Sequence, residues 1–107
     1  MFRNIFNNNT VERTPEQQTA IDEQTKSLAL YHFDSCPFCM RVRNGIDAMS
    51  LNIERRNIHQ DRQHFEDLLR GGGKTQVPAL QITHEDGRVE WMYESMDILN
   101  YLKQRFD

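Results

Sequence analysis

The sequence predicts an α/β domain in which a βαβ unit is followed by a ββα unit. Two strand-like runs flank an amphipathic helix in the first half of the chain, and an Asp-Gly pair joins two further runs in the second half. A periodic apolar segment near the end predicts a last helix. The 107 residues suit one domain. We expect parallel strands in the βαβ unit and antiparallel strands from the hairpin.

Charge and hydropathy exclude several classes of function. Thirteen basic and 16 acidic residues give a net charge of −3, without the strong basic field of a nucleic-acid-binding protein. No apolar run approaches the roughly 20 residues that span a bilayer, and no signal peptide precedes the first motif. We therefore expect a soluble, cytoplasmic protein without a nucleic-acid partner.

Residues 1–27 are predicted to be a polar extension, and residues 28–107 the domain itself. The Thr-Pro-Glu-Gln run at 14–17 predicts a capping box at the start of a helix over about 15–25. The extension either folds against the domain or leads into a membrane or partner attachment. We favour the first alternative because its apolar residues are few. The most prominent are Phe2, Ile5 and Phe6 near the start, and Ala20 and Ile21 in the helix.

Residue patterns in the domain predict four strands and three helices. The strands are 28–33, 53–58, 79–83 and 88–92. One helix begins at the cysteine pair, a second has Asp61 as its N-cap and stops at the glycines 71–73, and the third lies near 95–106. The side chains expected to face the core are Val42, Ile46 and Met49 in the first, Phe65, Leu68 and Leu69 in the second, and Ile98, Leu99, Leu102 and Phe106 in the third.

The segment Cys36-Pro37-Phe38-Cys39 is the first motif that indicates a chemistry. A structural zinc site needs four ligands, and the chain offers two cysteines and four scattered histidines, His32, His59, His64 and His84. A Cys-x-x-Cys that follows a strand and opens a helix within a βαβ unit is typical of a redox pair. We therefore expect a redox-active dithiol and no metal.

The start of the helix favours a thiolate at Cys36. Unpaired N–H groups and the helix dipole stabilise an anion there, and the thiolate is the nucleophile of disulfide exchange. Cys39 lies within reach but inside the first turn, so we expect Cys36 to attack and Cys39 to resolve. Arg41 and Arg43 either add to the stabilisation of the thiolate or belong to a solvated helix face.

Residues 75–78, Thr-Gln-Val-Pro, are a second candidate part of the site. In redox folds with a Cys-x-x-Cys at a helix start, a cis proline lies opposite the dithiol. A cis Pro78 would turn the backbone of Val77 outward, where an extended substrate can pair with it. The alternative is a trans proline at the start of a strand. The cysteine motif favours the cis form.

Residues 93–97, at the start of the last predicted helix, are a third candidate part. Free N–H groups and the Ser95 hydroxyl suit a carboxylate, and Glu94 or Asp97 suits a neighbouring ammonium group. Together they would fit the α-amino-acid end of a γ-glutamyl group. An ordinary serine cap with acidic first-turn residues explains the same side chains.

The three motifs together resemble the glutaredoxins, especially the bacterial branch whose domain is similar to the N-terminal domain of glutathione S-transferases. The resemblance covers about 28–106. It implies a thioredoxin fold, with Cys36 as the nucleophile and Cys39 as the resolving thiol. It also implies a glutathione site formed by Gln76, Val77 and cis Pro78 at the cysteinyl part and by Glu94 and Ser95 at the γ-glutamyl end.

The chain departs from the pattern of that family in three places, one of which is Trp-Met-Tyr-Glu at 91–94 in place of a glycine-rich stretch, the transferase-like form. Many members carry a lysine shortly before the first cysteine, which contacts the glycine carboxylate of glutathione, whereas this chain has Phe-Asp-Ser at 33–35. Lys74 is the nearest basic candidate for that contact, and Arg41 is another. Phe38 stands where tyrosine is commoner, a change that keeps the ring and removes the hydroxyl.

The resemblance implies a glutathione-dependent thiol–disulfide oxidoreductase that reduces protein–glutathione mixed disulfides and protein disulfides, and we expect a monomer. One alternative is a stand-alone glutathione transferase-like domain that conjugates glutathione to electrophiles. The other is a module that holds an iron–sulfur cluster with glutathione across a dimer. That role usually accompanies a single active-site cysteine followed by glycine, so Pro37 argues against it.

Overall fold

The computed structural model describes residues 10–106. The helices are α1 (Pro15–Thr25), α2 (Pro37–Ala48), α3 (Arg62–Gly72) and α4 (Ser95–Phe106), and the strands are β1 (Leu28–His32), β2 (Glu54–Asn57), β3 (Ala79–Thr83) and β4 (Val89–Met92). The predicted order and type of the elements are confirmed. The predicted strand bounds agree with these to within one residue at each end.

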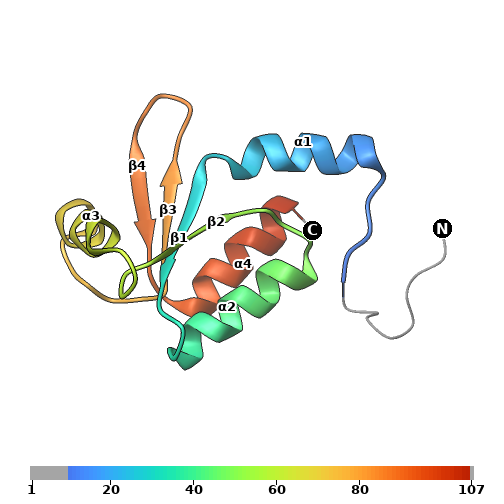
Figure 1. Ribbon diagram of the computed structural model, residues 1–107. Coiled ribbons are helices and arrows are strands. Elements are labelled where there is room, and N and C mark those ends of the chain that lie inside the picture. Colours follow the sequence, from blue (N-terminus) through green and yellow to red (C-terminus); the bar gives the residue numbers. More distant parts are fainter. Residues whose placement is uncertain (1–9, 107) are drawn as a thin grey trace.

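The strands form one mixed sheet in the order β2-β1-β3-β4. β1 and β2 are parallel, whereas β3 is antiparallel to both β1 and β4. Figure 1 shows α2 and α4 side by side on one face of this sheet and α3 on the other. The topology is that of a thioredoxin fold, as the resemblance implied.

Side chains of β1 are buried on both faces of the sheet. Leu28 and Leu30 join the larger core cluster, beneath α2 and α4, while Ala29 and Tyr31 join a smaller cluster beneath α3. Alternation along a strand produces this division. Because β1 is paired with a strand on each side, its end has a fixed position in the fold. The loop that follows β1 and leads to the cysteine motif therefore starts from a fixed position.

The core-facing positions of α2 are confirmed, since Val42, Ile46 and Met49 are all buried. In α4, Ile98, Leu102 and Phe106 are buried as predicted. Leu99 is half-buried and packs against the edge of the larger cluster. Both helices thus present an apolar stripe to the same face of the sheet.

The prediction for α3 is wrong at one point. Leu68 is fully buried, but Leu69 is 47% exposed, because one further residue turns the side chain about 100° around the helix axis. The predicted stop at the glycines is confirmed, since the helix ends at Gly72 with Gly73 as its C-cap. Gly73 has φ +82°, the left-handed conformation that glycine adopts readily.

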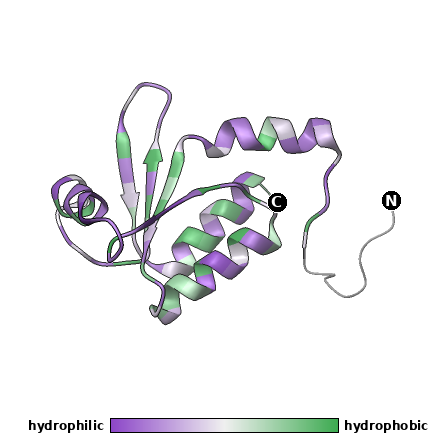
Figure 2. Cartoon of the chain, viewed as in Figure 1, coloured by the Kyte–Doolittle hydropathy of each residue, from purple (hydrophilic) through white to green (hydrophobic). Residues whose placement is uncertain are grey.

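The helix predicted in the N-terminal extension, α1, is confirmed with its capping box. The Thr14 hydroxyl accepts from the Gln17 N–H at 3.2 Å, and the Gln17 side chain accepts from the Thr14 N–H at 3.1 Å. Ala20, predicted as an anchor, is exposed. Ile21 packs against the larger core cluster, and Thr25 is buried. Figure 2 shows how hydrophilic most of α1 is, which explains why so few of its residues anchor it.

The segment before α1 lies against the ends of α2 and α4. The Val11 N–H donates to the carbonyl of Ala48 at 2.7 Å. Arg13 donates to the carbonyls of Met49 at 2.7 Å and Phe106 at 3.3 Å. Phe2, Ile5 and Phe6 lie outside the described residues. Within 10–106, no helix has the length and apolar character needed to cross a membrane.

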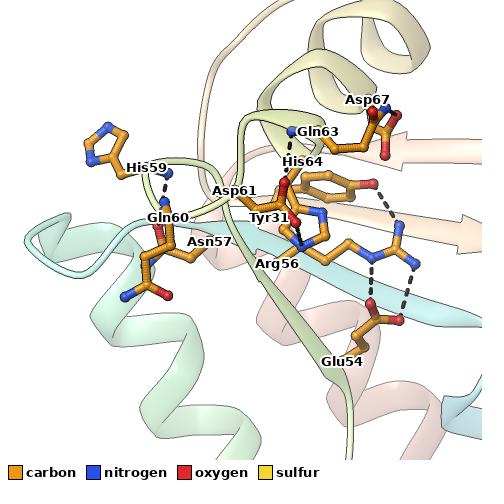
Figure 3. A network of polar contacts seen from close by, with 10 residues as sticks. All are labelled: Tyr31, Glu54, Arg56, Asn57, His59, Gln60, Asp61, Gln63, His64 and Asp67. Atoms are coloured by element: carbon orange, nitrogen blue, oxygen red, sulfur yellow. Dashed lines mark hydrogen bonds and ion pairs between the residues drawn. The ribbon is translucent and has the colours of Figure 1, made fainter.

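A polar network joins β2 to the start of α3 (Figure 3). Asp61 is the predicted N-cap, and its carboxylate accepts from the Gln63 N–H at 2.9 Å. Arg56 pairs with Glu54 at 2.8 Å and donates to the Tyr31 hydroxyl at 2.7 Å. The first of these bonds caps α3, and the bond to Tyr31 joins β2 to β1.

Candidate active site

Cys36 is the N-cap residue of α2 and directly follows the loop after β1. Its sulfur accepts a hydrogen bond from the Cys39 N–H at 3.1 Å. One of the unpaired N–H groups of the helix start is therefore directed at the sulfur. Pro37 occupies the first helical position, where the missing N–H costs no hydrogen bond. The predicted location of Cys36 at a helix start is confirmed.

The two thiols have different surroundings. Both are free and buried, but Cys36 keeps 6% of its surface exposed and Cys39 none. Burial, followed by the hydrogen bond with Cys36, raises the pKa of the Cys39 thiol to about 12. Cys39 is therefore protonated near neutral pH, and Cys36 is the more exposed of the two residues.

Arg43 braces the loop that leads to Cys36. Its guanidinium donates to the carbonyls of Phe33 at 3.3 Å and Asp34 at 3.2 Å, and its Nη1 lies 3.0 Å from Nδ1 of His32. Since arginine has only donors, this His32 nitrogen acts as the acceptor. Burial, and then Arg43, lower the pKa of His32. Arg43 thus serves the loop rather than a solvated helix face.

The peptide bond between Val77 and Pro78 is cis, as the sequence favoured. Pro78 is buried and Val77 half-buried. Within residues 10–106, no hydrogen bond involves the backbone N–H or C=O of Val77. This backbone unit can therefore pair with an extended peptide-like ligand, in the manner of an added strand.

A cleft of about 330 Å³ runs between the start of α2, the loop before β3 and the start of α4. Its lining comprises Phe38, Arg41, Gln76, Val77, Pro78, Tyr93, Glu94, Ser95 and Met96. The fold thus brings together five of the predicted glutathione-site residues from two distant segments. Neither cysteine is part of the lining, but Phe38 lies between them in the same turn.

The start of α4 forms one wall of the cleft. Ser95 is its first residue and is buried, while Glu94 is exposed and its carbonyl accepts from the Ile98 N–H at 2.9 Å. The first N–H groups of a helix lack intrahelical partners and attract anions. The arrangement can hold a carboxylate at the helix start with an ammonium group beside Glu94.

The basic residues lie differently from what the sequence suggested. Lys74 is not among the residues that line the cleft, and its Nζ lies 4.1 Å from the centre of the Tyr93 ring. Arg41 does line the cleft. Tyr93 and Met96 also line it, although sequence reasoning gave them no role. Both belong to the same 93–97 motif as Glu94, and this was the signal in the sequence that could have indicated them as cleft residues.

A larger hollow, about 770 Å³, lies between α1, the end of β3 and α4. No residue of the cysteine motif lines it, whereas Phe38 of that motif lines the smaller cleft. Its histidine, His84, is paired with Glu90 at 2.9 Å. Chemistry rather than volume therefore identifies the smaller cleft as the candidate site.

The fold and the site together define a thioredoxin-fold protein with a dithiol at a helix start. The chain belongs to the family "Glutathione S-transferase, N-terminal domain", whose model matches residues 30–107. It is 35% identical over 75 residues to glutaredoxin 2 of Escherichia coli strain K12, a match that covers 70% of this chain and 32% of that protein. The chain thus spans about a third of the length of this relative. These findings confirm the predicted resemblance to a transferase-like glutaredoxin.

Solved structures with a similar fold include an isomerase with a bound glutathione derivative and a glutathione transferase. A maleylacetoacetate isomerase from Anaeromyxobacter dehalogenans 2CP-1, with bound dicarboxyethyl glutathione and citrate in its active site, is 32% identical. Its TM-score is 0.56, and the match covers 75% of this chain and 37% of that one. Leishmania TDR1, a trimeric glutathione transferase, is 26% identical with a TM-score of 0.59, over 74% of this chain and 18% of that one.

Proposed function

We propose that this domain is a glutathione-dependent thiol–disulfide oxidoreductase that acts through Cys36 and Cys39. The observation that carries the proposal is the contrast between the two sulfurs. A helix N–H is directed at Cys36, whereas Cys39 is fully buried and its pKa is raised to about 12. Such a pair suits one attacking and one resolving thiol. The similarity to glutaredoxin 2 supports the same reaction.

Glutathione is a substrate of this reaction, and the cleft offers groups for each of its parts. The unpaired backbone of Val77 suits the cysteinyl unit, with Gln76 and Pro78 beside it. The start of α4 at Ser95 suits the γ-glutamyl carboxylate, and Glu94 its ammonium group. Lys74, next to the cleft on the Tyr93 ring, stays our candidate for the glycine carboxylate.

The reaction with a glutathionylated protein needs only one cysteine. The Cys36 thiolate attacks the glutathione sulfur of the mixed disulfide, and the protein leaves as a thiolate that takes up a proton. A bond now joins Cys36 to glutathione. The thiolate of a second glutathione attacks the glutathione sulfur of this bond, which releases oxidised glutathione and restores the Cys36 thiolate. Stabilisation of that thiolate makes Cys36 a good leaving group.

A protein disulfide requires both cysteines. Cys36 attacks one sulfur and releases the other as a thiolate. Cys39 then gives up its proton and attacks Cys36, which forms the Cys36–Cys39 disulfide and releases the second protein thiolate. Two molecules of glutathione reduce this disulfide and leave as oxidised glutathione. Two electrons thus pass from glutathione to the protein disulfide.

Two serine variants test the proposal. We expect Cys36→Ser to remove both activities, because it removes the nucleophile. We expect Cys39→Ser to keep the deglutathionylation of a protein and to lose the reduction of a protein disulfide. Rates with glutathione, glutathione reductase and NADPH measure both reactions. Deglutathionylation by Cys36→Ser at the wild-type rate would refute the assignment.

A second candidate is a transferase or isomerase activity, favoured by the similarity to the isomerase with a bound glutathione derivative. Conjugation of glutathione to 1-chloro-2,4-dinitrobenzene separates this candidate from the first. The oxidoreductase proposal expects no acceleration above the uncatalysed rate. Acceleration that survives Cys36→Ser would favour the second candidate.

A further inference from the structure

Arg41 differs from the other arginines of residues 10–106 in what its guanidinium contacts. Each of the others lies within hydrogen-bond or ion-pair distance of an oxygen atom; they are Arg13, Arg43, Arg55, Arg56, Arg62, Arg70, Arg88 and Arg105. Arg41 instead places its Nη1 3.9 Å from the sulfur of Met96 and its Cζ 5.7 Å from the centre of the Phe38 ring. Within residues 10–106, the N–H donors of Arg41 have no oxygen partner.

Phe38 and Met96 form an exposed apolar rim around this guanidinium. They come from α2 and α4, are 57% and 53% exposed, and line the candidate cleft together with Arg41. We refer to these three residues as the rim patch. Aromatic residues, methionine and arginine are enriched in protein interfaces. A guanidinium held by a ring and a sulfur keeps its donor fork available for a carboxylate.

We propose that the rim patch binds the protein part of a glutathionylated substrate and selects partners with an acidic side chain beside the modified cysteine. The inference rests on the proposed function. An acidic side chain complements Arg41 in charge, and neighbouring residues of the partner cover Phe38 and Met96. Glutathione also carries carboxylates, but it has no large apolar side chain for the rim. A protein segment therefore satisfies all three residues.

The test uses two synthetic peptides with one glutathionylated cysteine, flanked by glutamate in the first and by lysine in the second. We measure kcat/KM for both peptides with the full chain and with Arg41→Glu. We expect the wild type to favour the glutamate peptide about fivefold, the size of a single exposed ion pair. We expect Arg41→Glu to favour the lysine peptide. The ratio of the two values cancels any general loss of activity.

Arg88→Glu is the matched control, because Arg88 is exposed and does not line the cleft. It makes the same change in charge, and we expect it to keep the wild-type ratio. An unchanged ratio in Arg41→Glu overturns the proposal, including the case in which both peptides lose activity equally and Arg41 serves glutathione itself. A wild type without activity on either peptide overturns the proposed function, and the role of Arg41 with it.

Discussion

Cys39 is the more deeply buried of the two cysteines of the candidate site. Cys39 has no exposed surface, and its pKa is raised to about 12. To close onto Cys36, Cys39 must first lose its proton. At pH values below the pKa of a thiol, its thiolate fraction rises about tenfold for each unit by which the pH increases. The closing step is therefore expected to depend strongly on pH.

This dependence is measurable without an external thiol. When Cys36 is first converted to its mixed disulfide with glutathione, closure by Cys39 releases free glutathione. We expect the release rate to rise steadily from pH 6 to pH 9, and Cys39→Ser to release none. A rate that levels off below pH 8 would contradict the raised pKa of Cys39.

His32 makes the stability of the fold depend on pH. Burial first, and Arg43 second, lower its pKa from the ordinary 6.5. Below that value the unfolded chain binds more protons than the folded one. The contribution to stability is therefore complete above about pH 6.5 and is lost as pH falls toward the lowered pKa of the folded state.

His32→Gln isolates this effect, because the amide oxygen of glutamine can still accept a hydrogen bond from Arg43, whereas the glutamine side chain does not titrate. Between pH 7 and pH 5 we expect the free energy of unfolding to fall more steeply in the wild type, by up to about 1.4 kcal/mol per pH unit. Urea unfolding at each pH measures both slopes. Equal slopes would show that His32 is not held neutral by the fold.

At the scale of elements, close contact between α3 and the segment after β4 positions one wall of the cleft. A Cβ at Gly72 would overlap the Tyr93 hydroxyl. That hydroxyl donates to the Gly72 carbonyl at 3.0 Å. Glycine thus allows α3 to approach Tyr93, a residue that lines the cleft.

A double-mutant cycle tests this contact. We expect Gly72→Ala to lower the free energy of unfolding by about 1–3 kcal/mol through overpacking, and Tyr93→Phe to lower it by about 1 kcal/mol through loss of a hydrogen bond. Because Tyr93→Phe removes the atom that the new Cβ would meet, we expect the double variant to lose less than the sum. Denaturant unfolding gives all three values, and strict additivity would rule out the contact.

At the scale of the whole molecule, the segment before α1 ties together the ends of α2 and α4 that lie away from the dithiol. Arg13 donates to carbonyls that follow α2 and to the last residue of α4. A cation at helix carboxyl ends satisfies free carbonyls and complements the helix dipole. Cys36 lies at the other end of α2, about 18 Å away for a helix of this length.

We therefore expect Arg13→Ala to affect stability without changing the chemistry of the site. The free energy of unfolding should fall by about 1–3 kcal/mol, since carbonyls lose charged hydrogen bonds. The rate of Cys36 alkylation by iodoacetamide in the folded state should match the wild type. Arg62→Ala, which removes an exposed side chain paired with Glu66, should change stability by at most about 0.5 kcal/mol. If Arg62→Ala lowered the free energy of unfolding as much as Arg13→Ala, the contacts of Arg13 with the helix ends would not explain its effect.

Local signals let the sequence predict much of this molecule. Periodicity, caps and the Asp-Gly turn predicted all eight elements, because each depends on residues that are neighbours along the chain. The cysteine motif predicted a dithiol at a helix start for the same reason. The errors fell where local pattern is weak. Leu69 and Ala20 are apolar residues at positions where small rotations of a helix decide exposure.

By itself, the sequence determined the order of the elements, the location of Cys36 and the segments that form the cleft. Only the tertiary structure decided how the basic residues are distributed. Arg43 braces the loop, Arg13 joins two helix ends, Lys74 lies on a tyrosine ring and Arg41 lines the cleft. Such long side chains reach partners far away in sequence, so their contacts depend on how whole elements pack, which no local pattern specifies.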